Sequence, residues 1–200
     1  MAVTARKVGR PGARRAVTPA RDVLQLVDGR LKLAVVADTH SHPHPRCAER
    51  LRAEAPSAIL HAGDIGELTV LDELAEIAPL FAVRGNIDTR AAGIPDARTL
   101  EVREGERRLL TLVLLHIAVY GPKLRAEAAA LARAEDAALV VCGHSHVPFL
   151  GRDRGIAIFN PGSVGPRRFT LPILYGVIDI ARDRVEIRHV DCETGARWTP

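Results

Sequence analysis

The chain has 200 residues, of which 47% are hydrophobic, 26% charged and 4% aromatic. This balance is typical of one soluble globular domain with an aliphatic core, and it excludes a disordered, collagenous or fibrous chain. The three cysteines are an odd number without a Cys-x-x-Cys pair, which disfavours a disulfide framework and indicates a reducing, cytoplasmic environment. No stretch reaches the about 20 apolar residues of a spanning helix, so no membrane partner is expected.

Positive charge is concentrated at the N-terminus. The net charge is +4, but residues 1–30 hold seven basic and two acidic residues, so the other residues sum to about −1. We expect residues 1–30 to form a basic, flexible N-terminal extension and residues 31–200 to form the domain. An arm for nucleic acid is an alternative without aromatic residues to support it, and a transit peptide is disfavoured by Pro11, Gly12 and Pro19.

The first half of the domain alternates strands and helices. Residues 31–37 are a nearly continuous apolar run, as in a strand buried on both faces. The elements that follow are a helix over 46–55, a strand over 57–60, a helix over 67–78 and a strand over 80–83. This order is typical of an α/β sheet.

The second half is richer in strands. Neighbouring strands are predicted over 97–102 and 107–115, and the Ala-rich segment 123–135 predicts a helix. Five short strands follow, over 138–142, 148–150, 156–159, 173–180 and 185–190. The Asp183 region between the last two predicts a hairpin turn.

Polar side chains follow most of these strands, at the position where sites gather in open α/β folds. The segments are Asp38-Thr39-His40, His61-Ala62-Gly63-Asp64, Arg84-Gly85-Asn86-Ile87-Asp88, His116, Gly143-His144-Ser145-His146 and Asn160-Pro161-Gly162-Ser163. One such segment means little, since roughly 0.5 Asp-x-His matches are expected by chance in this composition. Six together indicate a functional site. His42 and His44, which are followed by Pro43 and Pro45, are interpreted as surface residues.

These residue types predict a centre of two metal ions. The candidate ligands are Asp38, His40, Asp64, Asn86, His116, His144 and His146. The set mixes oxygen and nitrogen donors without a thiolate, which disfavours structural zinc. Seven donors are too many for one four-coordinate ion, and they suit two cations about 3.5–4 Å apart that share a carboxylate. Gly63, Gly85 and Gly143 each precede a candidate, where the missing Cβ lets the backbone approach closely.

The order of these motifs resembles the calcineurin-like metallophosphoesterase superfamily. The chain length and the Gly-Asn-Ile-Asp variant at 85–88 are similar to its small YfcE-like phosphodiesterase branch. The resemblance covers about residues 31–180. It implies an α/β fold in which two mixed β-sheets pack as a sandwich flanked by helices. It also implies two divalent cations, manganese first, with iron, zinc or nickel as alternatives.

The resemblance also assigns roles to residues. It implies one metal held by Asp38, His40, Asp64 and His146, and a second held by Asp64, Asn86, His116 and His144. Asp64 would then be the bridging ligand, and Asp64, Asn86 and His116 would take part directly in catalysis. Asp88 would orient a ligand or water. Arg84 and Arg167 are candidates for binding the substrate phosphate, with Arg168 as a weaker one, and solvated surface charge is the alternative for each.

Two departures from the family pattern concern the leaving group. Ile87 stands where many members carry a histidine that helps the leaving group depart, and Ile117-Ala118 replaces the Gly-His that often follows the histidine in the small branch. General acid help is worth about 10²–10⁴ in rate. We therefore expect the best activity on activated aryl or nucleotide phosphoesters.

Two functions follow from this resemblance. The first is a phosphoesterase, favouring diesters, that hydrolyses a small or nucleotide-like phosphoester by in-line attack of a metal-bound hydroxide. The alternative is a catalytically weak or inactive scaffold that binds protein, like the retromer subunit of the superfamily, with Ile117 and Ala118 adding apolar surface at the mouth of the site. The complete ligand set favours the enzyme. The oligomeric state stays open.

Overall fold

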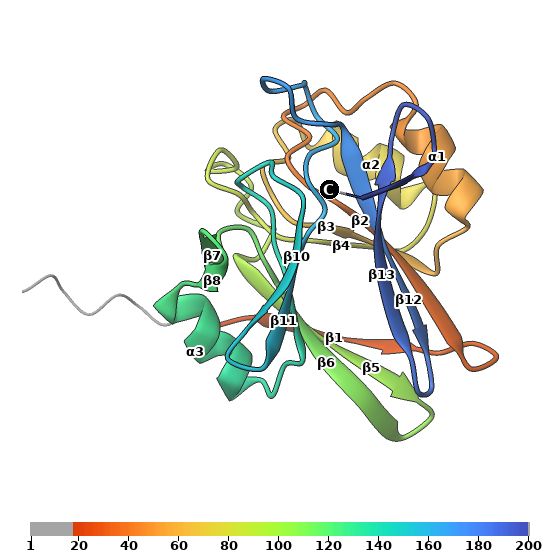
Figure 1. Ribbon diagram of the computed structural model, residues 1–200, viewed down its shortest axis with the longest axis vertical. Coiled ribbons are helices and arrows are strands. Elements are labelled where there is room, and N and C mark those ends of the chain that lie inside the picture. The colour runs from red at the N-terminus through yellow and green to blue at the C-terminus, as the bar shows by residue number, and fades with distance from the viewer. Residues whose placement is uncertain (1–17, 200) are drawn as a thin grey trace, which may run out of the picture.

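The computed structural model describes residues 18–199, which form two six-stranded sheets and a two-stranded ribbon. In Figure 1 the sheets face each other, with helices α1 (Cys47–Glu54) and α2 (Thr69–Ala75) outside one sheet and α3 (Ala126–Ala134) outside the other. The predicted architecture of two mixed sheets flanked by helices is confirmed.

The first sheet places three parallel strands side by side. Its order is β14 (Arg197–Trp198), β13 (Val185–Asp191), β12 (Leu174–Ala181), β2 (Arg30–Val36), β3 (Ala58–His61) and β4 (Leu80–Ala82). Strands β2, β3 and β4 are parallel, with Val36 opposite His61 and His61 opposite Ala82. The three strands therefore end level, and the loops after them leave from one edge.

The second sheet repeats this arrangement. Its order is β1 (Ala20–Gln25), β5 (Ala97–Glu104), β6 (Arg107–Leu115), β9 (Leu139–Val141), β11 (Ile156–Asn160) and β10 (Phe149–Asp153), and the ribbon pairs β7 (Val119–Tyr120) with β8 (Lys123–Leu124). Strands β6, β9 and β11 are parallel, with Leu114 opposite Val141 and Val141 opposite Phe159. Their ends are also level, so each sheet presents one edge of loops after parallel strands.

The alternating side-chain directions along β2 show why its residues 33–36 are all apolar. Leu33 and Val35 belong to the core between the sheets, whereas Ala34 and Val36 pack with Leu51 of α1. All five side chains are fully buried. Successive strand side chains point to opposite faces, so a central strand covered on both sides needs apolar residues at every position.

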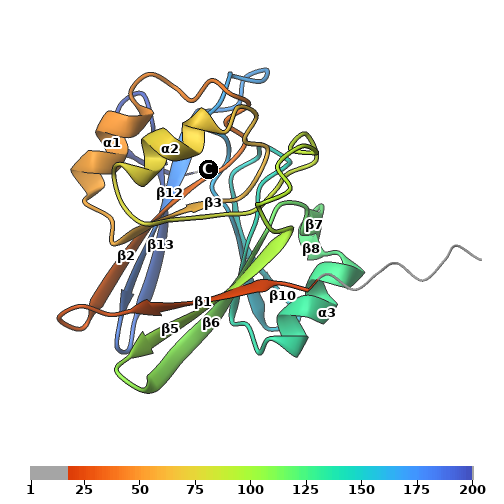
Figure 2. The same ribbon diagram turned by 180° about the vertical axis from the view of Figure 1, so that it is seen from behind.

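The N-terminal boundary of the domain is a correction to the sequence analysis. Strand β1 lies within the predicted extension 1–30, yet it pairs in parallel with β5, and Leu24 is buried in the core. Figure 2 shows β1 running along this sheet. Its charged residues belong to the sheet surface, where Asp22 lies 2.6 Å from Arg98. The flexible extension was predicted from the positive charge of residues 1–30, and strand β1 was not predicted. Residues 1–17, where the arm and transit-peptide alternatives mainly fall, lie outside the described residues.

Most other predicted elements are present within a few residues of their expected bounds. The strand pair joined at Asp183 is the antiparallel hairpin of β12 and β13. The predicted helix from residue 123 begins later, because Lys123 pairs with Tyr120 in the ribbon and Arg125 is extended, with φ −63° and ψ 153°. Within residues 18–199, no helix is long and apolar enough to cross a membrane.

Candidate metal centre

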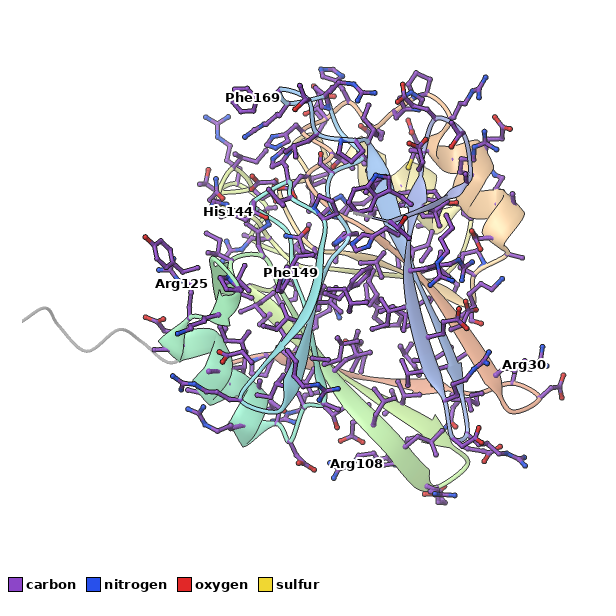
Figure 3. The ribbon with its side chains drawn as sticks, in the orientation of Figure 1. Arg30, Arg108, Arg125, His144, Phe149 and Phe169 are labelled. Atoms are coloured by element: carbon purple, nitrogen blue, oxygen red, sulfur yellow. The ribbon has the colours of Figure 1, made fainter. Side chains whose placement is uncertain are left out.

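The loops after β2, β3, β4, β6 and β9 converge at one end of the sandwich. They carry all seven candidate ligands, and short contacts between ring nitrogen, amide and carboxylate atoms connect the whole set. In Figure 3 His144 lies toward the same end as Phe169, far from Arg30 and Arg108 at the other end. Level strand ends in both sheets explain why segments remote in the sequence meet here.

The first cluster consists of Asp38, His40 and His146, whose donor atoms lie within 4.8 Å of one another. His146 Nε2 lies 3.4 Å from Asp38 Oδ1 and 3.2 Å from His40 Nε2. The two imidazole rings stack with centroids 5.1 Å apart. The backbone N–H of His144 donates to Asp38 Oδ2 at 3.0 Å, which fixes the carboxylate.

The second cluster consists of Asp64, His116 and His144, with Asn86 between the two rings. His116 Nε2 lies 3.2 Å from Asp64 Oδ1 and 3.1 Å from Asn86 Oδ1, and His144 Nδ1 lies 3.0 Å from the same amide oxygen. His116 Nδ1 is 2.7 Å from the carbonyl oxygen of Ala62. With its proton on Nδ1, the ring is oriented so that Nε2 faces the cluster.

Asp64 lies between the clusters. Its Oδ1 faces His116, and its Oδ2 lies 3.8 Å from His40 Nε2. Burial alone would raise the pKa of Asp64, but the hydrogen bond and charge of His116 and the N–H of Ile87 outweigh burial and lower the pKa to about 2. The structure thus puts an ionised carboxylate where a bridging ligand is expected.

The chemistry of this donor set fits cations. Burial raises the pKa of Asp38 to about 7, and burial lowers the pKa of His146 to about 4, so neither charged form is well supported by the protein alone. The Nε2 atoms of His40 and His146 face each other, although both rings are driven toward the neutral form by burial. Carboxylate, amide and neutral imidazole donors suit manganese, iron, zinc or nickel. A cation would satisfy both facing nitrogens and the buried carboxylate.

Left-handed backbone conformations are frequent among the candidate ligands. Five of the seven have a positive φ, between 46° and 72°: Asp38, His40, Asp64, His144 and His146. Such conformations are uncommon for residues other than glycine and persist where the surroundings enforce them. The strain therefore supports a functional role for these loops.

The three predicted glycines contact ligands directly. A Cβ on Gly85 would lie 2.1 Å from the backbone nitrogen of Asp64, and one on Gly143 would lie 2.9 Å from Asp38 Oδ2. Gly63 combines a φ of +90° with a Cβ position 2.8 Å from His116 Nδ1. Each glycine is needed because a ligand occupies the space of its missing side chain.

Asp88 holds two ligand loops together. Its buried carboxylate accepts backbone N–H bonds from Ile65, Gly66 and Gly85, at 3.0, 2.9 and 2.7 Å. The loops after β3 and β4 are therefore tied to each other close to Asp64. Asp88 thus bonds to the backbone of these loops, and its expected role in orienting a ligand or water stays a prediction.

His61 is a supporting residue that the sequence analysis named in a polar segment but did not include among the candidate ligands. It is fully buried, and its Nδ1 accepts the backbone N–H of Gly63 at 3.1 Å. Its Nε2–H therefore donates to Thr39 Oγ1 at 3.0 Å, and that hydroxyl donates to the carbonyl of Ile65 at 2.9 Å. Burial lowers the pKa of His61 to about 4. The signal was a polar residue that ends an otherwise apolar strand.

The arginine at the centre differs from the two favoured by the sequence analysis. Arg84 forms an ion pair with Asp96 at 2.7 Å, and Arg167 pairs with Glu193. Arg168 instead points to the first cluster, with Nη2 3.2 Å from His40 Nε2, and it has no ion pair among residues 18–199. Acidic partners far along the chain occupy the first two guanidinium groups, a contact that local sequence does not reveal.

The apolar surface expected from residues 117 and 118 is also corrected. Ala118 is 1% exposed and packs in the cluster beneath α3 with Val113 and Ala128. Ile117 is only partly exposed. This pair therefore contributes to packing behind His116 rather than to an apolar mouth.

Comparisons with known proteins agree with this geometry. A family model described as the calcineurin-like phosphoesterase superfamily domain matches residues 31–183. A protein of Methanocaldococcus jannaschii named probable metallophosphoesterase is 28% identical over 144 residues, 69% of this chain and 70% of that protein. One of the same name from Methanothermobacter thermautotrophicus is 34% identical over 116 residues, 57% of this chain and 64% of that protein. The chain thus spans about two thirds of the length of these relatives.

Solved structures share the fold. Vps29 of Entamoeba histolytica in complex with zinc has a TM-score of 0.66 and 20% identity, covering 84% of this chain and 96% of that chain. The Escherichia coli phosphoesterase YfcE has a TM-score of 0.58 and 21% identity, covering 84% and 97%. At these identities the likeness is one of fold alone.

Proposed function

The chain belongs to the calcineurin-like phosphoesterase superfamily, and on this premise we propose that it is a phosphoesterase with two divalent cations that favours phosphodiesters. The observation that carries the proposal is the position of Asp64, whose two carboxylate oxygens face two separate groups of donors. A single ion would not need both groups. Two ions that share a carboxylate would use all seven.

The residues would divide between the ions as the clusters do. Asp38, His40, Asp64 and His146 would hold one cation, and Asp64, Asn86, His116 and His144 would hold the other. The set mixes three oxygen and four imidazole donors without a thiolate, which is compatible with manganese as the first choice and with iron, zinc and nickel as alternatives. When bound, the two cations supply Lewis-acid charge that stabilises a phosphoryl group under attack and makes water more acidic.

The protein's own residues determine how a phosphoester reaches that charge. Asn86 and His144 are exposed, so the substrate enters from their side of the centre. Arg168 brings a guanidinium with no acidic partner among the described residues, suited to a non-bridging phosphate oxygen. The side chain of Ile87 offers no proton. This position therefore supplies no general acid, which favours substrates whose leaving group departs as a stable anion.

The test is metal analysis together with a panel of phosphomonoesters and phosphodiesters. The wild type should bind about two divalent ions and hydrolyse diesters best. Asp64→Asn should lose most bound metal and all measurable turnover, while Asp96→Asn, which changes an exposed aspartate, should lose neither. Equal metal content in wild type and Asp64→Asn would contradict the bridging role, and no turnover on any ester would contradict the activity.

A protein-binding scaffold is the second candidate. Two aromatic side chains are almost fully exposed, Tyr120 at 85% and Phe169 at 93%, and aromatic residues of this kind are enriched in protein interfaces. The seven retained donors favour the enzyme. A metal-loaded protein without turnover would favour the scaffold.

A further inference from the structure

A pocket of about 240 Å³ opens beside the candidate metal centre. It lies between the loop that follows β3 and the loop that follows β4. Its wall combines the apolar side chains of Leu68, Ile87 and Ala91 with the cation of Arg90. Leu68 and Ile87 are 47% and 43% exposed, which is unusual for large aliphatic side chains that lie together.

The pocket is rigidly connected to the bridging carboxylate. The backbone N–H of Ile87 donates to Asp64 Oδ1 at 3.2 Å, while its side chain lines the pocket. The carboxylate of Asp88 ties the two walls together through the N–H groups of Gly66 and Gly85. A group bound here would therefore lie next to the candidate metal centre, in a site that these hydrogen bonds hold in place.

The wall offers no group that could protonate a departing alkoxide. Ile87 and Leu68 carry no acid, and the carboxylate of Asp88 is occupied by three backbone N–H donors. An alcohol that leaves as a stable anion, such as a phenol, needs no such acid. The chemistry of the pocket therefore selects an aromatic alcohol over an alkyl alcohol.

The volume of the pocket and the positive charge of Arg90 suit an aromatic ring. A cavity of about 150 Å³ is enough to hold benzene, so 240 Å³ accommodates one substituted ring. Arg90 has no ion pair among the described residues, and a guanidinium both stacks on aromatic faces and attracts a developing phenolate charge.

We propose that the pocket lined by Leu68, Ile87 and Arg90 binds the leaving group of the substrate, and that this group is an aromatic alcohol. The inference rests on the proposed phosphodiesterase activity. In the reaction a water oxygen forms a bond to phosphorus and the bond from phosphorus to the aryl oxygen breaks. The phenolate leaves with the electron pair of that bond, and the proton lost by water goes to solvent.

The test uses ligands that cannot be hydrolysed. Calorimetry of the zinc-loaded protein should show phenylphosphonate binding about tenfold more tightly than methylphosphonate, because the ring buries apolar surface. Leu68→Ser and Ile87→Ser should each reduce this ratio to about one. Leu150→Ser is the matched control, since Leu150 is also half-exposed, at 50%, and lies on β10 away from the candidate ligands; its ratio should stay near tenfold.

The outcomes separate this inference from the proposed function. Equal affinity of the two phosphonates for the wild type, with turnover of phosphodiesters intact, would overturn the pocket alone. A ratio that persists in both serine variants would also overturn it, and Ile87→Ser decides the matter if Leu68→Ser fails to fold. Absence of turnover on every phosphoester would overturn the proposed function, and the leaving-group role with it.

Discussion

The two clusters of candidate metal ligands differ in how deeply their side chains are buried. In the first, Asp38 and His146 are buried and His40 stacks on His146. In the second, Asp64 and His116 are equally buried, but Asn86 and His144 are exposed. On the proposed function, this difference predicts that the first cluster serves mainly to retain a cation and that the second also contacts the substrate. Removing a donor should therefore have different consequences in the two clusters.

The largest effect is expected from paired substitutions in the two clusters. His146→Ala should lose most of one cation and reduce turnover more than about a hundredfold, since even outer contacts of metal ligands are worth 10–100-fold. His144→Ala should keep most of its metal and lose turnover about tenfold. Metal analysis measures the cation content of the two variants, and initial rates on one diester measure their turnover. Equal metal loss in the two variants would contradict the proposed difference between the clusters.

A gain of function would test the role of the second cluster, which is the more exposed of the two. Ile87→His places a proton donor beside Asn86, so turnover of an alkyl phosphodiester should rise about tenfold, whereas an aryl phosphodiester, which needs no acid, should show no such gain. Ile87→Gln, which fills the position without an acid, is the control. The gain should fall away at high pH, where the new ring is neutral. An equal gain with the glutamine variant would mean that shape rather than proton transfer is responsible.

A smaller effect on substrate binding is expected at the first cluster. Arg168→Ala should raise the KM of a diester about tenfold with less change in kcat, because a charged hydrogen bond to phosphate is lost. Arg84→Ala and Arg167→Ala remove arginines already paired with Asp96 and Glu193 and should leave KM unchanged. Steady-state kinetics on the three variants show which arginine binds the substrate. A larger rise in KM for Arg84→Ala would support the expectation from the sequence that Arg84 binds the phosphate.

The smallest effect on turnover, but a clear one on stability, is expected at His61, which connects the loops of both clusters. Burial lowers its pKa from 6.5 to about 4. As the pH falls below 6.5, the unfolded chain takes up a proton that the folded protein excludes. Its contribution to stability is therefore complete above pH 6.5 and declines toward pH 4, by on the order of 3 kcal/mol.

His61→Asn keeps an acceptor for the Gly63 N–H and removes this titration. Urea unfolding of the metal-free proteins at pH 7 and pH 4.5 should show a smaller acid-induced loss in the variant. The raised pKa of Asp38 has the opposite pH dependence, but it is common to both proteins and cancels in the difference. The same pH slope in both proteins would show that His61 does not carry the effect.

Sequence patterns predicted the alternating elements and the donor residues because these signals are local. Apolar runs identified β2 and β3, and the motifs after the strands identified every residue that now lies in the two clusters. The partner of Arg84 is twelve residues away and that of Arg167 twenty-six, so the choice of Arg168 could not be read locally. Strand β1 was missed because its outward charges resemble those of a solvated tail, and only pairing with β5 identifies it.

The sequence by itself determined the kinds of donor atoms and the order in which strands deliver them, because residue type and periodicity act within a few positions. Only the tertiary structure decided that these donors meet in one place, which arginine reaches them, and that Leu68 and Ile87 form a pocket beside Asp64. These outcomes depend on the level ends of parallel strands in two sheets, and that registration arises from long-range pairing and packing rather than from any local segment.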